Sequence, residues 1–370
     1  MTISTKPPKD NPIAIIGAGM AGLSCAHFLS LAGHSVHVFD KSRGPSGRMS
    51  TRRSNDNLVD WQCDHGAQYF TARDIDFRKQ VAEWEQESVA APWQARIGTH
   101  DGHGFKLQAR TLERFVGTPR MTSPAAHMVR SMQKLPNPVR FQWQTTIQPL
   151  HTSACYEPGW SLHSPENGAE LPRYQAVLIA VPAPQAVPLV AKVSQEATTL
   201  SQSVRMRACW SLMVRCPQTV PLPVDGCFME NSPLRWIARD NSKPGRNGPE
   251  TWLLHASHSW SQVHVDDELQ TVITILLEAF TQLGGPKPTS VKATAHRWLY
   301  ADSVSPANVG GVVGSPSRPR AVRRLAPKWH CGGRMAQRPQ SRTTGSLVAT
   351  LHYCASQLVL TIHHQLNHQK

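Results

Sequence analysis

A glycine-rich turn between two short apolar segments constrains the fold of this chain more than any other feature. Residues 13–16 read Ile-Ala-Ile-Ile, which is typical of a buried parallel strand. They run directly into the turn Gly17-Ala18-Gly19-Met20-Ala21-Gly22, and an apolar helical stretch then continues to Gly33. A second strand-like segment, Ser35–Phe39, ends at Asp40. This order of strand, turn, helix, strand and acid predicts a βαβ unit.

The residues of the turn suit a dinucleotide. Gly17 permits the tight change from strand to helix, Gly19 lets a pyrophosphate approach the backbone, and Gly22 lets the helix pack closely on the strand. The helix N-terminus offers amide groups and the positive end of its dipole to phosphates. Asp40 is placed to accept hydrogen bonds from a ribose hydroxyl. The sequence therefore predicts a Rossmann-type dinucleotide-binding domain.

The loop after Asp40 favours FAD over a nicotinamide dinucleotide. Residues 41–50 form a second flexible, basic loop, whereas a domain that binds only a nicotinamide would continue to its third strand. The loop resembles the Gly-Gly-Arg loop of amine-oxidase-type flavoproteins, which contacts the FAD diphosphate and ribityl chain. Here Ser46 replaces the first glycine, before Gly47 and Arg48, and serine does not adopt a positive φ cheaply. The forked guanidinium of Arg48 suits phosphate oxygens, and a solvated basic loop is the alternative interpretation.

Several motifs together resemble one known family, renalase and its bacterial relatives. They begin with Gly17–Gly22, Asp40-Lys41, Gly47-Arg48-Met49 and the nine residues Cys63–Thr71. Further segments extend the resemblance over residues 12–309: Phe115–Pro119, Val177–Gln185, Arg235–Arg239, Trp252–Ser257 and His296–Trp298.

The resemblance implies an α/β fold of the p-hydroxybenzoate-hydroxylase or amine-oxidase type. In that fold a Rossmann-type FAD-binding domain carries an inserted α+β substrate domain. The implied activity is the oxidation of an isomeric dihydronicotinamide nucleotide, whose hydride passes to N5 of the FAD and whose electrons then reach O2. An amine-oxidase-type flavoenzyme and a degenerate, non-catalytic chain remain alternatives.

The same resemblance supplies candidate site residues. Residues 66–69 resemble the strand and turn beside the isoalloxazine ring, so backbone N–H groups and the Gln68 amide are expected to bond the edge of the ring. Tyr69 belongs to this stretch beside the ring, whereas Trp236 and His255 come from segments that resemble the substrate-domain sheet covering the flavin. Each of the three is also a candidate core residue. The candidate catalytic residues are Gln68, Tyr69, Trp236 and His255. The candidate cofactor-binding residues are Gly17, Gly19, Met20, Ala21, Gly22, Asp40, Lys41, Gly47, Arg48, Met49, His65, Gly66, Ala67 and Gln68.

The family's domain plan predicts a discontinuous chain. Residues 12–80, 141–185 and 291–309 are expected to form the FAD-binding domain, and residues 81–140 and 186–290 the substrate domain. Residues 1–11 are expected to be a disordered N-terminus and residues 310–370 an anomalous tail. Apolar residues at helical spacing predict a helix over 266–283. Strands are predicted near residues 141–147, 160–163, 176–184, 210–214 and 251–256.

The positive charge of the chain is concentrated in its tail. The formal net charge is +14, yet Asp302 is the last acidic residue and residues 303–370 contain nine Lys or Arg and no Asp or Glu. This basic segment lacks the interleaved aromatic residues and the motif of a nucleic-acid-binding domain, so we expect no nucleic-acid partner.

A change of reading frame explains the tail. The family ends with a Trp-Trp-Asp strand, a Cys-Gly-Asp-Trp turn and a Gly-Arg-Val-Glu-Gly-Ala segment, and none of these occurs here. When the tail is back-translated and read from the second base of each codon, Val312–Gly314 permits Trp-Trp-Asp and Val322–Leu325 permits Cys-Gly-Asp-Trp. Cys331–Arg338 permits Val-Glu-Gly-Ala-Trp-Leu-Ser-Gly in the same frame, and the tryptophan, read from Met335-Ala336, is forced. The sequence therefore predicts that the tail is out of frame from about residue 310.

Other features indicate a cytoplasmic protein. The first twelve residues are polar and proline-rich, without the apolar core of a signal peptide, and no apolar run reaches the ~18 residues that a membrane span needs. The eight cysteines contain no C-x-x-C pair, and the 18 histidines show no metal-ligand spacing. We therefore expect reduced thiols, no metal and no membrane partner.

Overall fold

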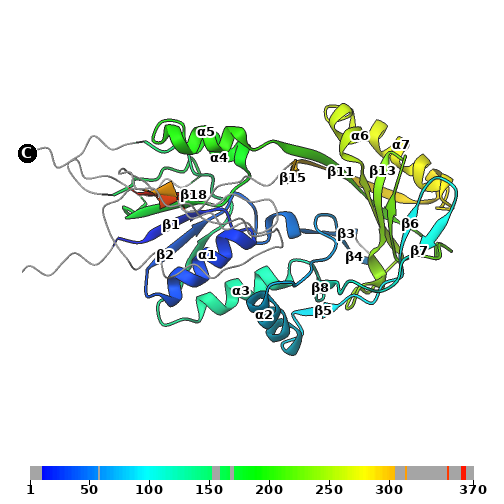
Figure 1. Ribbon diagram of the computed structural model, residues 1–370, viewed down its shortest axis with the longest axis horizontal. Helices are drawn as coiled ribbons and strands as arrows, with labels where there is room; N and C mark the ends of the chain where they lie inside the picture. Colours follow the sequence, from blue (N-terminus) through cyan, green and yellow to red (C-terminus); the bar gives the residue numbers. More distant parts are fainter. Residues whose placement is uncertain are drawn as a thin grey trace, which may run out of the picture. The chain divides into compact units, whose positions relative to one another are not determined.

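A computed structural model describes residues 11–56, 59–151, 159–166 and 171–304, together with short strands at 313–314, 348–349 and 360–363 (Figure 1). The chain forms two compact units from interleaved segments. Unit 1 comprises residues 1–47, 125–205 and 305–370, and unit 2 comprises residues 48–124 and 206–304.

Unit 1 is built on a five-stranded sheet in the order β18-β10-β1-β2-β9. β1 (Ile13–Ile16) lies between β2 (Val36–Phe39) and β10 (Ala176–Ile179) and is parallel to both. β9 (Arg140–Gln142) is parallel to β2, and β18 (Leu360–His363) is antiparallel to β10. Every residue of β1 and β2 is buried, so the predicted pair of buried parallel strands is confirmed.

Helices cover both faces of this sheet, as Figure 1 shows. Alternate residues of β1 point to opposite faces. Ile13 and Ile15 pack with α1 (Met20–Leu31) and α3 (Ser123–Gln133). Ala14 and Ile16 share the other core with the buried side chains of α4 (Ala183–Val190) and α5 (Gln195–Ser203). The glycine turn therefore lies at the carboxyl end of a fully covered parallel sheet, where this kind of fold binds its ligands.

Unit 2 is built on a seven-stranded sheet. Its order is β15 (Lys292–Ser303), β11 (Met206–Arg215), β14 (Thr251–Ala256), β13 (Leu234–Arg239), β12 (Gly226–Met229), β6 (Ile97–His100) and β7 (Phe105–Leu107). Neighbours are antiparallel except β12 and β6, which are parallel. The predicted strands at 210–214 and 251–256 are confirmed.

One face of this sheet is covered by α6 (His258–Val263) and α7 (Leu269–Gln282) (Figure 1). The buried side chains of α7 pack against Trp210, Leu212, Trp252 and Leu254. The predicted helix over 266–283 is confirmed with a later start, because Glu268 has extended backbone at the N-cap position.

The other face of the sheet carries shorter elements. The hairpin of β3 (Thr51–Asp56) and β4 (Val59–Asp64) places Trp61 and Cys63 against Met213 and Leu253. The remaining elements of unit 2 are α2 (Ile75–Gln86), β5 (Ala90–Pro92), β8 (Phe115–Gly117) and the short 3₁₀ helices η1 (Gly47–Met49), η2 (Asp240–Ser242) and η3 (Pro288–Ser290). Beyond residue 304, β16 (Val313–Gly314) pairs with β17 (Val348–Ala349).

The two units divide the chain at residues other than the predicted domain boundaries. Residues 291–304 belong to unit 2, because β15 pairs with β11 along its length. Residues 48–80 also belong to unit 2, because the β3–β4 hairpin packs on its sheet. Residues 125–140 and 186–205 belong to unit 1, because α3, α4 and α5 pack on its sheet. Most of the predicted tail, 310–370, and all but residue 11 of the predicted disordered segment lie outside the described residues.

Three predicted strands are shorter in the structure. The segment 141–147 contributes only Phe141 and Gln142 to β9, and 160–163 contributes only an isolated bridge between Trp160 and Tyr174. The strand predicted to run to Pro184 ends at Ile179, because Pro182 is the N-cap of α4.

Candidate functional site

The turn after β1 requires glycine at two positions. Gly17 has φ +107°, and a Cβ there would lie 2.5 Å from the carbonyl oxygen of Ala180. A Cβ on Gly22 would lie 1.9 Å from the carbonyl oxygen of Gly17. Strand, turn and helix therefore approach one another as closely as a Rossmann turn demands.

The helix after the turn has an open N-terminus. Gly19 is the N-cap of α1, no side chain caps the helix, and its first turn, which contains Met20, Ala21 and Gly22, has no acidic residue. Asp40 closes the neighbouring strand, and its Oδ2 accepts a hydrogen bond from the amide of Ala18 at 2.7 Å. Its Oδ1 accepts from the amide of Ser42 at 2.8 Å. The carboxylate is thus held against the turn, and each oxygen keeps a lone pair for a ligand hydroxyl.

The loop after Asp40 returns to the same turn. The amide of Ser46 donates to the carbonyl of Ala18 at 3.0 Å, and Ser46 forms a parallel bridge with Gly19. Ser46 has φ +114° and Gly47 has φ +54°, so a serine occupies a position whose backbone favours glycine. Lys41 is exposed. The loop therefore has the positive φ that a glycine would adopt at position 46, although the residue there is a serine.

Arg48 and Met49 begin unit 2. Arg48 donates from Nη1 to the carbonyl of Ala301 at 3.0 Å, so one of its donors is used within unit 2. Its own carbonyl accepts from the amide of Ala67 at 2.8 Å, and a Cβ on Gly66 would lie 2.0 Å from that carbonyl. Met49 packs beside the core cluster that contains Trp93 and Trp236. The backbone of Arg48 therefore lies directly against the backbone of residues 66–67, which the sequence had also assigned to the cofactor site.

His65 contacts side chains from three strands of the seven-stranded sheet, β11, β14 and β15. Its carbonyl accepts hydrogen bonds from Ser211 Oγ at 2.9 Å and Trp298 Nε1 at 3.0 Å, and lies 3.3 Å from His255 Nε2. Its ring stacks on Trp298 with a centroid separation of 5.2 Å and meets His296 edge-on at 4.9 Å. Burial lowers the pKa of His65 to about 3 and that of His255 to about 3. Both imidazoles are consequently neutral near pH 7.

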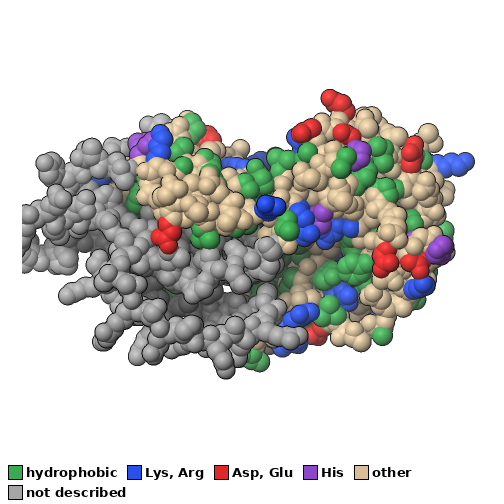
Figure 2. Space-filling view, turned by 45° about the horizontal axis from the view of Figure 1, so that its top comes forward, with side chains coloured by type: hydrophobic (Ala, Val, Ile, Leu, Met, Phe, Trp, Pro, Cys, Tyr) green, Lys and Arg blue, Asp and Glu red, His purple; other side chains and the backbone are tan. Residues whose placement is uncertain are grey.

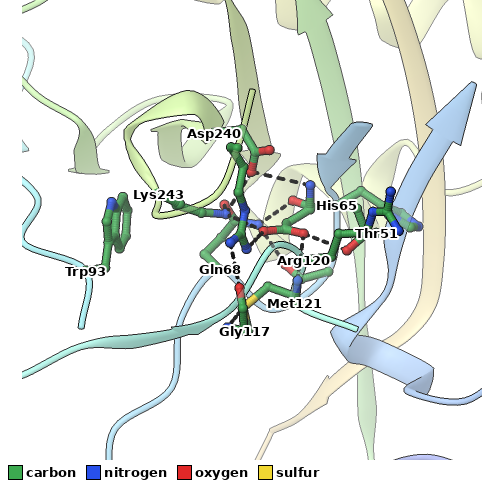
Figure 3. A network of polar contacts seen from close by, with 12 residues as sticks. Thr51, His65, Gln68, Trp93, Gly117, Arg120, Met121, Asp240 and Lys243 are labelled. Carbon is green, nitrogen blue, oxygen red and sulfur yellow. Dashed lines mark hydrogen bonds and ion pairs between the residues drawn. The ribbon is translucent and has the colours of Figure 1, made fainter. Parts of the chain in front are cut away.

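Gln68 uses its whole carboxamide inside unit 2. Its Nε2 donates to the carbonyl of Asp64 at 2.6 Å and to the carbonyl of Gly66 at 3.1 Å, and its Oε1 accepts from Lys243 Nζ at 3.1 Å (Figure 3). With the amide of Ala67 also taken by Arg48, these two groups hold the 64–68 segment in place. Gln68 is therefore arranged as a positioning residue.

A buried network of four charged side chains holds the same segment (Figure 3). Lys243 Nζ lies 3.2 Å from Asp64 Oδ2 and 2.9 Å from Asp240 Oδ1, and its side chain has 0% exposure. Arg246 Nη2 lies 2.6 Å from Asp64 Oδ2. Asp64 Oδ1 also accepts from Thr51 Oγ1 at 2.6 Å. Two acids and two bases balance in formal charge, which is what allows all four to be buried.

The network shifts the pKa values of its two carboxyl groups in opposite directions. Burial alone would raise the pKa of Asp64, but Lys243 and Arg246 outweigh it and hold that pKa well below its usual range. Burial raises the pKa of Asp240, against the attraction of Lys243. Sequence reasoning missed this network. Its sequence signals were an acid within the Cys63–Thr71 motif, Asp64, and the two bases of the loop after β13. Lys243 lies 179 residues after Asp64, so their spacing did not connect them.

Aromatic side chains gather next to the network. Tyr69, Trp93 and Trp236 have ring centroids 5.9 to 6.4 Å apart, and the Arg114 guanidinium lies 5.1 Å from the centre of the Tyr69 ring. Trp236 is 4% exposed, and its Nε1 has no hydrogen-bond partner among the residues that the structure describes. Trp236 pairs with His255 across β13 and β14, on the face away from α7. The structure therefore brings the four candidate catalytic residues into one region of unit 2.

The surface of unit 2 has a basic area. Figure 2 shows Lys and Arg side chains and a histidine grouped beside hydrophobic side chains on its described surface. Arg52 lowers the pKa of His296, after burial, and Arg235 contributes to the lowered pKa of His255. Arg52 and Arg235 therefore disfavour the protonated forms of His296 and His255, in the same direction as burial.

Within the described ranges, no three His, Cys, Asp or Glu side chains are placed to hold a metal ion. Cys25, Cys63, Cys209, Cys216 and Cys227 are free thiols. No helix in the described part of the chain has the length and apolarity to cross a membrane.

Comparison with known proteins finds a match for the βαβ region. The NAD(P)-binding Rossmann-like domain family matches residues 15–84. The L-amino-acid oxidase of Daboia russelii is 50% identical over 50 residues, 14% of this chain and 10% of that protein. The L-amino-acid oxidase of Gloydius halys is 41% identical over 63 residues, 17% of this chain and 12% of that protein. The chain thus matches about a tenth of the length of these relatives.

Solved structures resemble a much larger part of the chain. Cyclohexylamine oxidase from Brevibacterium oxydans matches with a TM-score of 0.60 and 11% identity, over 81% of this chain and 89% of that one. Putrescine oxidase bound to putrescine matches with a TM-score of 0.57 and 11% identity, over 79% of this chain and 85% of that one. An oxidoreductase from Methanosarcina mazei matches at 0.57 and 10% identity, over 78% and 88%. The chain therefore has the mixed α/β fold of these oxidases, with a Rossmann-like dinucleotide-binding domain at its front.

Proposed function

We propose that this chain is a renalase-like, FAD-dependent oxidoreductase that oxidises an isomeric dihydronicotinamide nucleotide with O2 as the electron acceptor. The observation that carries the proposal is the turn of unit 1, in which two obligatory glycines, an uncapped helix and the Asp40 carboxylate lie together. The motifs between residues 12 and 309 add the family resemblance.

The residues present fit FAD. The glycine turn lets α1 start close against β1, with no acid in the first turn of the helix. Asp40 offers lone pairs to a ribose, and the buried Ser46 hydroxyl has no partner among the described residues. Gly17, Gly19, Met20, Ala21, Gly22, Asp40 and Lys41 would hold the adenosine diphosphate part. Gly47, Arg48, Met49, His65 and Gly66 are proposed for the remainder. Contrary to the expectation from the sequence, the Gln68 carboxamide and the Ala67 amide are already bonded within unit 2, so these two residues would position the segment and not bond the flavin edge. Bound FAD would supply the redox chemistry, taking a hydride and returning electrons to dioxygen.

The chain's own contribution is orientation and electrostatics. The hydrogen bonds to the carbonyl of His65 and the buried network around Asp64 hold the 64–68 segment rigidly. We propose that Tyr69, Trp236 and His255 line the substrate side of this segment. The lowered pKa of His255 keeps its imidazole neutral near pH 7, so it adds no charge beside the substrate.

The charges of unit 2 favour an anionic substrate over an amine. The two acids nearest the candidate catalytic residues, Asp64 and Asp240, are buried and already paired with Lys243 and Arg246, so neither is available to an ammonium group. Arg114 and Lys243 already lie against the rings of Tyr69 and Trp93, where an amine would form cation–π contacts. Arg52 and Arg235 near the histidines suit the phosphates of a nicotinamide nucleotide.

We further propose that the tail is out of frame from about residue 310. Sequencing the gene across that codon is the direct test, and one inserted or deleted base is the expected result. The chain as written should hold FAD weakly, because it lacks the family's last turn and helix. Stoichiometric flavin in this exact chain would contradict the frame-change proposal.

The activity is tested in the chain with its frame restored. Under nitrogen, dihydronicotinamides carrying their hydride at the 2- or 6-position should bleach the visible flavin band. Admission of air should restore the band and produce hydrogen peroxide. Reduction by putrescine or cyclohexylamine alone would favour the amine-oxidase alternative. A purified, folded, colourless protein that refuses added FAD would instead support the degenerate, non-catalytic alternative.

A further inference from the structure

The side chain of Ser46 is buried beside the glycine turn of unit 1 and has no hydrogen-bond partner in the part of the chain that the structure describes. Ser46 is 3% exposed, and its Oγ bonds to none of the residues that the structure describes. Its amide is tied to the carbonyl of Ala18, and its backbone bridges to Gly19, the N-cap of α1. Burying a hydroxyl without a partner costs free energy, so a partner is expected when the protein is at work.

The backbone of Ser46 is strained as well. Its φ of +114° lies in the region that residues with a Cβ rarely adopt, whereas a glycine would occupy it without strain. A strained residue with an unsatisfied buried hydroxyl is an outlier of the kind that gathers at ligand-binding positions. The two features occur in one residue, at the point where the loop 41–47 meets the turn 17–22.

We propose that Ser46 is a phosphate-binding residue whose Oγ–H donates to a phosphate oxygen of the bound dinucleotide. The neighbouring groups select an anion, because α1 begins at Met20 with no side-chain cap and no acid in its first turn. The positive end of the α1 dipole favours negative charge there. The Ser46 hydroxyl forms no hydrogen bond to Asp40 in the described structure, and the two Asp40 oxygens accept from the amides of Ala18 and Ser42 instead. The inference rests on the proposed dinucleotide site and adds a ligand contact that a glycine at position 46 would lack.

Two substitutions separate the hydroxyl from the backbone strain. Ser46→Ala removes the hydroxyl and keeps the strained φ, whereas Ser46→Gly removes both. The probes are ADP, which carries the diphosphate, and adenosine, which does not. Titrations use the full chain with its frame restored, as in the activity test, and are followed by ligand-observed NMR or calorimetry.

Ser46→Ala should weaken ADP binding about tenfold, the loss of one charge-assisted hydrogen bond, and leave adenosine binding unchanged. Ser46→Gly should raise the thermal midpoint of unfolding and still bind ADP more weakly than the unchanged chain. Gly104→Ala serves as a control, because its Cβ meets nothing within 4 Å.

Equal ADP affinities in the unchanged chain and in Ser46→Ala would overturn the role of the hydroxyl while leaving the dinucleotide site standing. If the alanine variant does not fold, Ser46→Gly decides the question, since full ADP affinity in that variant also overturns the role. An unchanged chain that binds neither ADP nor adenosine would overturn the dinucleotide site itself, and this inference with it.

Discussion

At the scale of single residues, the glycine turn depends as much on glycines, which have no side chain, as on the side chain of Asp40. Gly17, Gly19 and Gly22 were predicted from their spacing alone, because backbone approach in a Rossmann turn has few solutions. The structure adds the reason at two of them, where a carbonyl oxygen occupies the place of a Cβ. Ser46 shows the limit of such reasoning. The replacement was visible in the sequence, but its burial and its unpartnered hydroxyl were not.

Gly22→Ala should destabilise unit 1 despite the better helix propensity of alanine. The added Cβ would lie 1.9 Å from the carbonyl oxygen of Gly17, so the turn or the helix must shift. We expect a loss of ~1–3 kcal/mol in the free energy of unfolding, measured in urea, and weaker ADP binding. The same change at Gly104, which faces open space, is the control. Equal stability of the two variants would show that the turn is looser than described.

His65 should make stability depend on pH. Burial lowers its pKa from 6.5 to about 3, so the unfolded chain takes up a proton below pH 6.5 while the folded chain does not until about pH 3. This part of the folding free energy is therefore present above pH 6.5 and is lost as the pH falls towards 3. His65→Phe keeps a ring against Trp298 and removes the titration.

Between about pH 7 and about pH 5, the unchanged chain should lose roughly 1–2 kcal/mol more stability than His65→Phe. Urea unfolding at both pH values measures the difference. Parallel losses in the two proteins would mean that His65 is protonated in the folded state.

At the scale of elements, the sequence predicted periodic segments well and contacts between distant segments poorly. The run of β1, α1 and β2 and the apolar face of α7 follow from local spacing, and both are observed. The polar network does not, because Asp64 ends β4 while Asp240, Lys243 and Arg246 follow β13. Only the packing of the β3–β4 hairpin on the seven-stranded sheet brings them together. The segment 176–184 was predicted as one strand, but β10 ends at Ile179 and Pro182 is the N-cap of α4.

Lys243→Met should strongly destabilise unit 2, because it leaves Asp240 buried without an ion-pair partner among the described residues and Asp64 with Arg246 alone. Removing one partner from a buried ionic network costs ~3–5 kcal/mol. The double variant Lys243→Met/Asp240→Asn removes one charge of each sign and keeps the Asp64–Arg246 pair. It should recover most of the lost stability in a double-mutant cycle. Additive losses from the two substitutions would contradict an electrostatically balanced network.

At the scale of the whole molecule, each unit has its own sheet and its own core, although neither is continuous in sequence. The predicted domain boundaries followed the family plan, whereas the observed units follow which strands pair and which helices cover them. This difference arises because β15 completes the sheet of unit 2 and α3 to α5 complete unit 1. Such long-range pairing leaves little trace in local composition.

ADP should protect one unit selectively. The proposed contacts of ADP all lie in residues 17–47, so its binding should slow amide hydrogen exchange in β1, the start of α1 and β2. Peptides from β11 and β14, in unit 2, are the internal control and should exchange at an unchanged rate. Equal protection of both units by ADP would place its site elsewhere. Mass-spectrometric exchange with and without the nucleotide measures both.

The pairing of Met206 with Ser303 has a consequence for synthesis on the ribosome. The sheet of unit 2 joins strands from Ile97 to Ser303, so a nascent chain can close it only after nearly the whole of its in-frame message has been translated. The proposed slip of the message near codon 310 would come just after this point and would spare each of the seven strands of this sheet. The resulting polypeptide would contain every strand of the unit 2 sheet but would lack the last turn and helix that the family resemblance implies. We expect proteases to cleave the incomplete unit 1 first.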